Sequence, residues 1–220
     1  MALRLAGETP GVVQGLDGQG WPQMGSPGSV DLRVGLLRRP RTGAWMLHPY
    51  HALQYSTGSD TALAADSLRA MVPMDIPERW ELDGIEVHIA VAGDAGAEVR
   101  LGLYQDDGSG VHPGALEFDA GFVAADSTGI KSIALSPTKA VNPGRYYLAL
   151  LAKSVTTMPQ IRDTQNFLPL LGVNYILYPE SFGCIGVSQA YGPLPDPFPP
   201  SGSYIRKELL KIAFKLASVG

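Results

Sequence analysis

The sequence predicts an all-β fold, an antiparallel β-sandwich of jelly-roll type with an extended N-terminal arm. Short runs in which apolar and polar residues alternate recur roughly every 10 to 15 residues, with turn motifs between them. The 26 glycines and 18 prolines favour turns over long helices, and no regular helical segment separates the runs. A late strand that can return beside the early ones favours the jelly-roll version of the sandwich.

The arm is residues 1–58, which differ in composition from the rest of the chain. The stretch "GVVQGLDGQGWPQMGSPGS" is dense in glycine, proline and glutamine and has too few periodic apolar residues to form a core. One short strand is predicted over 30–37, where apolar residues alternate. Embedded in the arm are large apolar side chains expected to contact a partner chain: Trp21, Trp45, Met46 and Tyr50. The segment 44–53, which contains the last three, is expected to dock either on the main domain or on a neighbouring subunit.

The second domain, residues 59–220, contains the regular pattern. A first strand is expected over 68–74, with a helix over 61–70 as the competing interpretation because alanines are frequent there. The segment 85–91 places Ile85, Val87, Ile89 and Val91 on one face, and 98–104 repeats this alternation after the turn signal "GDAG". These two strands are predicted to pair as a hairpin.

Further strands are predicted downstream, over 115–125, 130–136 and 145–153, with a short one within 175–187. Residues 158–172 are expected to form a loop, and 191–202, with five prolines in twelve residues, an extended and semi-rigid one. At the C-terminus strict alternation over 210–216 favours a strand over a helix.

Composition and charge argue against several classes of protein. The net charge of −4 and the lack of a basic block do not favour a nucleic-acid partner. Cys184 is the only cysteine, which excludes a disulfide framework and a zinc site of several thiolates, and its apolar surroundings indicate a buried side chain. No signal peptide and no apolar run of about 20 residues is found, so we expect no membrane insertion.

The sequence offers no convincing catalytic or metal site. The loop from Asp106 to Pro113 gathers Asp106, Asp107 and His112, but it lacks the spacing of calcium ligands and is interpreted as a turn between strands. Replacing both aspartates with alanine is expected to leave folding nearly unchanged. The four histidines form no ligand pattern, and no nucleophile elbow or phosphate loop is present. We therefore expect no enzyme activity, no cofactor and no bound metal.

One part of the chain resembles a known module. The segment "ELDGIEVHIAVAGDAGAEVRLGLYQDDGSGVHPGALEFDAG", followed by "GRYYLALLA", is similar to a β-sandwich module of bacteriophage tail fibres, minor tail proteins and related virion appendages. The shared motifs are a Leu-Asp pair before a strand, "R-x-G-x-Y", an acidic glycine loop, "P-G-x-L" and a later "P-G-x-Y" motif. They span about residues 66–155 and are structural rather than catalytic.

This resemblance implies a structural protein of the virion, assembled in the host cytoplasm and exposed on the particle. It would dock on other phage structural proteins through residues 1–58 and present the sandwich, in a homo-oligomer that is expected to be a trimer. The alternative is a carbohydrate-binding module that recognises host surface glycans, for which Tyr191 and Phe198 of the proline-rich loop, or Tyr175 and Tyr178, are the candidate contacts.

Overall fold

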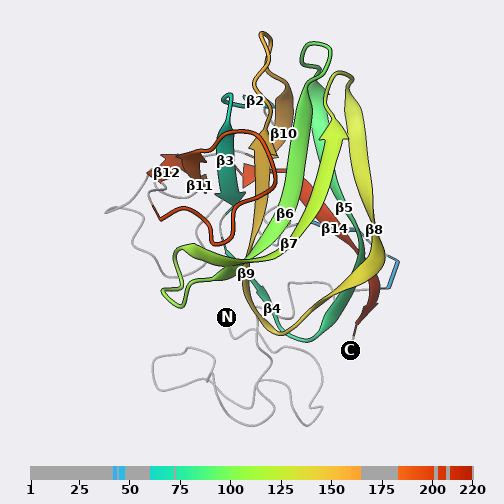
Figure 1. Cartoon of the computed structure of the whole chain (residues 1–220). Coiled ribbons are helices and arrows are strands. Elements are labelled where there is room, and N and C mark those ends of the chain that lie inside the picture. The colour runs from blue at the N-terminus through green and yellow to red at the C-terminus, as the bar shows by residue number, and fades with distance from the viewer. Residues whose placement is uncertain are drawn as a thin grey trace, which may run out of the picture. The chain divides into compact units, whose positions relative to one another are not determined.

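The computed structural model describes residues 42–43, 45–47, 60–71, 73–164, 183–200, 203–206 and 209–219. The chain divides into two compact units, Met1–Arg39 and Pro40–Gly220, and all described residues belong to the second. Every regular element in these ranges is a β-strand (Figure 1). Among the described residues there is no helix that could cross a membrane.

The strands form two antiparallel sheets, each with seven strands in the described part of the chain. Sheet 1 has the order β1-β14-β5-β10-β13, with β8 on the other edge of β5 and β2 beside β10. Its strands are β1 (Trp45–Leu47), β2 (Asp60–Ala62), β5 (Trp80–Val91), β8 (Gly129–Val141), β10 (Gln160–Thr164), β13 (Leu209–Leu210) and β14 (Ile212–Val219).

Sheet 2 has the order β12-β11-β3-β9-β6-β7, and β4 continues the edge of β9 beyond β3. Its strands are β3 (Ser67–Met71), β4 (Met74–Ile76), β6 (Glu98–Asp106), β7 (Pro113–Ala124), β9 (Gly144–Ala152), β11 (Gly183–Ser188) and β12 (Ser203–Arg206). The predicted β-sandwich is thereby confirmed. The C-terminal strand β14 lies between β1 and β5, as the jelly-roll expectation required of a late strand.

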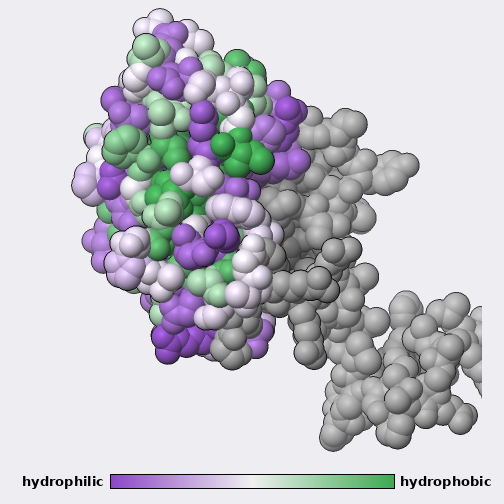
Figure 2. All heavy atoms as spheres, turned by 90° about the vertical axis from the view of Figure 1, so that its right-hand side faces the viewer, coloured by the Kyte–Doolittle hydropathy of each residue, from purple (hydrophilic) through white to green (hydrophobic). Residues whose placement is uncertain are grey.

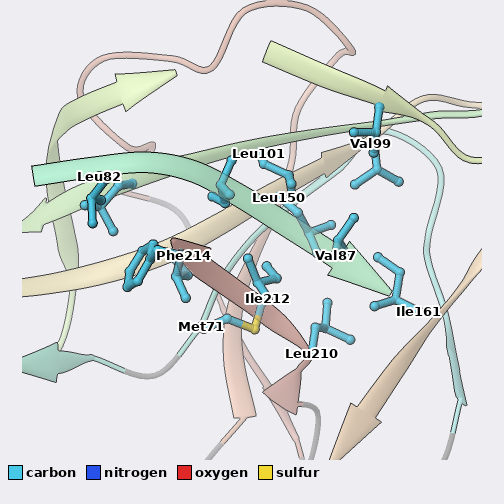
Figure 3. Close-up of a cluster of buried hydrophobic side chains, with 14 of the residues drawn as sticks. Met71, Leu82, Val87, Val99, Leu101, Leu150, Ile161, Leu210, Ile212 and Phe214 are labelled. Carbon is cyan, nitrogen blue, oxygen red and sulfur yellow. The ribbon is translucent and has the colours of Figure 1, made fainter. Parts of the chain in front are cut away.

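The main core lies between the two sheets, where alternating side chains of both converge (Figure 3). Sheet 1 contributes Leu82 and Val87 of β5 with Phe214 of β14, and sheet 2 contributes Leu101 of β6 and Leu150 of β9. All five side chains are fully buried. Burial of one face is what the alternation of the strand sequences predicts, because successive side chains point to opposite faces of a sheet.

A second core lies on the other face of sheet 2. There a segment of residues 189–200, called here the proline strap, covers the sheet and buries Leu194 and Phe198 against it (Figure 1). The strands beneath contribute Tyr104 of β6 and Tyr147 of β9. Strand β9 is therefore buried on both faces, and its sequence "YYLALLA" is apolar throughout rather than alternating.

The predicted hairpin of residues 85–91 and 98–104 is wrong, because β5 belongs to sheet 1 and β6 to sheet 2. The connection between them crosses from one sheet to the other. It is fixed by hydrogen bonds from the Gly93 amide to the Ala125 carbonyl and from the Thr157 amide to the Asp94 carboxylate. A Cβ at Gly93 would lie 2.8 Å from that of Ala97, so this corner admits only glycine without a shift.

The other predicted elements mostly agree with the structure. Residues 61–70 contain no helix but the end of β2, a turn and most of β3, and the first expected strand is split into β3 and β4. The strands predicted downstream correspond to β7, β8, β9 and β11, and residues 212–219 form a strand as expected. Within the predicted loop 158–172 the structure has a short strand, β10. The predicted strand over 30–37 lies outside the described residues.

Candidate functional site

The acidic loop that joins β6 to β7 is held together by Asp106. Its Oδ2 accepts hydrogen bonds from the Gly108 and Gly110 amides, both at 2.9 Å, and its Oδ1 accepts one from the Tyr147 hydroxyl, also at 2.9 Å. Burial and this carboxylate raise the pKa of Tyr147. Asp106 is thus a structural acceptor, and the expectation that its replacement leaves folding nearly unchanged is corrected.

Asp107 and His112 make different contacts in the same loop. Asp107 Oδ1 accepts a hydrogen bond from the Ser109 amide, and the Asp107 side chain is exposed. The side chain of Ser109, and then its amide, lower the pKa of Asp107. His112 Nδ1 lies 2.8 Å from the Pro113 carbonyl oxygen, and the ring packs edge-on against Phe198. The two side chains face each other only loosely, at 3.9 Å between His112 Nδ1 and Asp107 Oδ2.

A shallow hollow of about 440 Å³ opens beside this loop, between Asp75, Asp106 and Arg145. Arg145 makes a bidentate contact with the Asp75 carboxylate, at 2.9 and 3.3 Å, and a third hydrogen bond to the Gly110 carbonyl. The Asp75 carboxylate raises the pKa of Arg145. Among the described residues no group of three or more histidine, cysteine or acidic side chains is placed to hold a metal ion. The charged groups around the hollow serve to tie the loop to β4 and β9.

Of the two proposed glycan contacts in the proline strap, Phe198 is corrected by its burial, and the role of Tyr191 stays a prediction. Phe198 is 2% exposed and packs edge-on against Tyr104, so its ring is not available to a sugar. Tyr191 is half-buried, and Lys153 Nζ lies 5.9 Å from the centre of its ring. Tyr191 therefore packs at the border of the second core. Tyr175 and Tyr178 lie outside the described residues.

Charged side chains of β6 and β7 hold the strap in place. Arg100 Nε donates to both carboxylate oxygens of Asp119, at 2.7 and 2.9 Å, and the same carboxylate accepts a hydrogen bond from the Leu194 amide. Beside them Lys153 Nζ lies 2.9 Å from Glu98 Oε1, and this contact lowers the pKa of Glu98. These polar groups anchor the strap, which the proline-rich sequence alone did not indicate.

The clearest candidate for a contact surface lies on the outer face of sheet 1, around Trp45. The strand register aligns two rows of residues here, each with one residue from β1, β14, β5 and β8. The first row is Trp45, Lys215, Gly84 and Ala134, and the second is Leu47, Ala213, Glu86 and Ser132. Trp45 is 38% exposed.

Trp45 lies over Gly84, and the absence of a side chain there makes room for the indole. A Cβ at Gly84 would lie 3.1 Å from Trp45 Cη2 and 3.3 Å from Lys215 Cβ. Lys215 Nζ contacts Asp83 Oδ2 at 3.1 Å beside this row. In the second row, burial raises the pKa of Glu86. The surface therefore combines one exposed indole with a partly desolvated carboxylate and an ion pair.

Of the other residues expected in the contact surface, Met46 lies on β1 opposite Phe214. Trp21 and Tyr50 lie outside the described residues. Gly84 was missed by sequence reasoning, although an isolated glycine inside an alternating strand is a known sign of close approach by another group.

Comparison with known proteins found no match: neither a family model, nor a curated protein, nor a solved structure is similar to this chain. The likeness to virion β-sandwich modules therefore rests on the sequence motifs quoted above.

Proposed function

We propose that this chain is a structural protein of a bacteriophage virion, a tail fibre, minor tail or capsid-attached appendage that docks on other virion proteins through its N-terminal segment. The observation that carries the proposal is β1. Residues 45–47, from the segment expected to be the attachment arm, join the sandwich as an edge strand and leave Trp45 partly exposed. A tryptophan surrounded by polar groups is typical of the centre of a protein interface.

The sandwich itself suits a rigid, non-catalytic body. The strands β3, β6 and β9 of sheet 2 lie between the main core and the core under the proline strap, and most of their described side chains are buried. Asp106, which the sequence singled out as a possible site residue, and Asp119, which it did not, hold loops through several hydrogen bonds each. Because these carboxylates are engaged in hydrogen bonds to the protein itself, they support a scaffold role for the loops at the ends of the sandwich.

The proposal predicts a stable oligomer, with a trimer favoured, whose interface buries more than about 2,000 Å². Sedimentation equilibrium of the full chain at micromolar concentration is the first test. The second is detection of the chain in density-banded phage particles from cells that carry its gene, with an antibody raised against the purified protein. A soluble monomer that is absent from banded particles would refute the proposal.

A second candidate function, recognition of a host glycan, is favoured by one observation on β7. Phe122 is 54% exposed and lies opposite Arg100 in the β6–β7 ladder, so an aromatic ring stands beside the Arg100–Asp119 pair. Hydrophobic residues also gather on the side of the sandwich where β7 and β8 lie (Figure 2). A glycan array with Phe122→Ala as the matched control tests this function. If Phe122→Ala did not change glycan binding, the surface around Phe122 would be excluded as the glycan site.

A further inference from the structure

Strand β1 contacts two other strands of sheet 1, β14 and β5. It pairs with β14 in the register Trp45 to Lys215, Met46 to Phe214 and Leu47 to Ala213, and the Gly43 amide donates to the Leu216 carbonyl at 2.6 Å. Through Trp45 it also covers Gly84 of β5. Without β1, the edge of β14 would present its backbone groups to any suitable strand, which is how an extended segment adds to a sheet.

Gly84 determines which side chain a strand added to the edge of β14 can carry at this register. Glycine is unfavourable inside a strand by roughly 0.5–1 kcal/mol relative to alanine, yet it stands within the 12-residue strand β5. Its position in the row with Lys215 leaves a place that the indole of Trp45 fills. The edge of β14 (residues 213–216) together with Gly84, called here the β1 seat, therefore fits a strand that carries a large aromatic side chain at this register.

The connection between β1 and the next strand is long enough for β1 to reach another molecule. Twelve residues, 48–59, separate Leu47 from Asp60 of β2. Fully extended, they span about 40 Å, whereas a compact unit of this size has a radius of gyration of only about 16 Å. The same contacts can thus form within one chain or between neighbouring chains, and exchange of identical elements is a low-cost route to assembly.

We propose that the β1 seat is occupied in the assembled protein by residues 43–47 of a neighbouring copy, so that the copies are joined by exchanged β1 strands. This proposal rests on the proposed function, because exchange needs the high local concentration of copies that an assembled virion appendage provides. The partner is a second copy of this chain, and Trp45 is the residue that it inserts over Gly84.

Disulfide trapping in the full chain tests the exchange. In a Cys184→Ala background, Leu47→Cys and Ala213→Cys are introduced into separate, differently tagged copies, which are co-expressed and oxidised. These positions face each other in the register, so a covalent dimer forms only if β1 of one copy lies on β14 of the other. Leu47→Cys with Ser132→Cys, an exposed position two strands further along the same row, is the matched control for random collision.

The expected result is at least ten times more covalent dimer with Ala213→Cys than with Ser132→Cys. Gly84→Val should abolish this dimer without loss of the folded sandwich, because valine fills the place of the indole but is favourable in a strand. A chain with both Leu47→Cys and Ala213→Cys that cross-links only within itself would overturn the exchange, as would the absence of any cross-link.

Light scattering on the same samples separates this failure from that of the proposed function. If the protein is an oligomer but its β1 strands cross-link only within each chain, the exchange is refuted and the proposed structural role is not. A monomer that is also absent from phage particles removes both.

Discussion

The hydroxyl of Tyr147 donates a hydrogen bond to Asp106 Oδ1 across 2.9 Å, and this contact ties a central strand of sheet 2 to the acidic loop at its end. Tyr147 is fully buried, while Asp106 is only partly so. The same carboxylate accepts two backbone amides of the loop. A loop that looked like a solvated turn is therefore connected to the second core.

Asp106→Ala is expected to lower the free energy of unfolding by roughly 2–3 kcal/mol, because it removes the acceptor of one buried hydroxyl and of two amides. Tyr147→Phe should cost about 1 kcal/mol, since the loop amides keep their acceptor. Urea titration followed by tryptophan fluorescence gives both values. Asp107→Ala is the neighbouring control and should change the stability little, because its carboxylate is exposed. Equal effects of the two aspartate substitutions would contradict the role given to Asp106.

Phe198→Ala is expected to destabilise the protein by roughly 3–5 kcal/mol, the usual cost of removing a buried aromatic side chain. Its ring packs against Tyr104 and His112 beneath the proline strap. Phe198→Leu, which keeps most of the apolar volume, should lose less. Thermal unfolding by circular dichroism distinguishes these variants. If Phe198→Ala left the melting temperature unchanged but removed binding of a glycan, the original interpretation of Phe198 as a sugar contact would be right.

Gly102→Ala is expected to loosen the strap. The added Cβ would collide with Leu194 Cδ1 and lie 2.7 Å from the Phe118 carbonyl oxygen. Such overpacking typically costs roughly 1–3 kcal/mol. Gly192→Ala, within the strap itself, meets no atom within 4 Å and should change the stability by less than about 0.5 kcal/mol. Limited proteolysis should cut the strap faster in Gly102→Ala than in the original protein, and no faster in Gly192→Ala. Equal cleavage of both variants would count against this packing.

Most of the strands could be predicted from the sequence, because alternation depends only on which face of a strand is buried. It gives no information about which strands pair. For this reason the segments 85–91 and 98–104 were expected to form a hairpin, although β5 and β6 lie in different sheets. The expected loop 158–172 hid β10 because a five-residue strand leaves too short a pattern to recognise.

The candidate site was predicted less completely than the fold. Trp45 is partly exposed and its role in partner contact stays a prediction, whereas Phe198 is buried. An aromatic residue among prolines gives no sign of whether its loop lies on a sheet or projects from it. The sequence likewise did not indicate the role of Asp119, because its partners Arg100 and Leu194 are distant in sequence or on another element. Long-range contacts of this kind cannot be read from local patterns.

Glu86→Gln is expected to stabilise the protein at neutral pH. Burial on the outer face of sheet 1 raises the pKa of Glu86 above its ordinary value of 4.5, so the folded state binds a proton at this site more tightly than the unfolded state does. The contribution of Glu86 to stability is therefore fully present below about pH 4.5 and is lost as the pH rises through the folded pKa. Glutamine carries no charge at any pH and avoids this loss.

Urea titrations at pH 7 and at about pH 3.5 should show a higher free energy of unfolding for Glu86→Gln at pH 7 and little difference at the lower pH. Glu78→Gln makes the same change in net charge away from this face, and a similar gain in that variant would mean that the effect comes from overall charge rather than from the burial of Glu86.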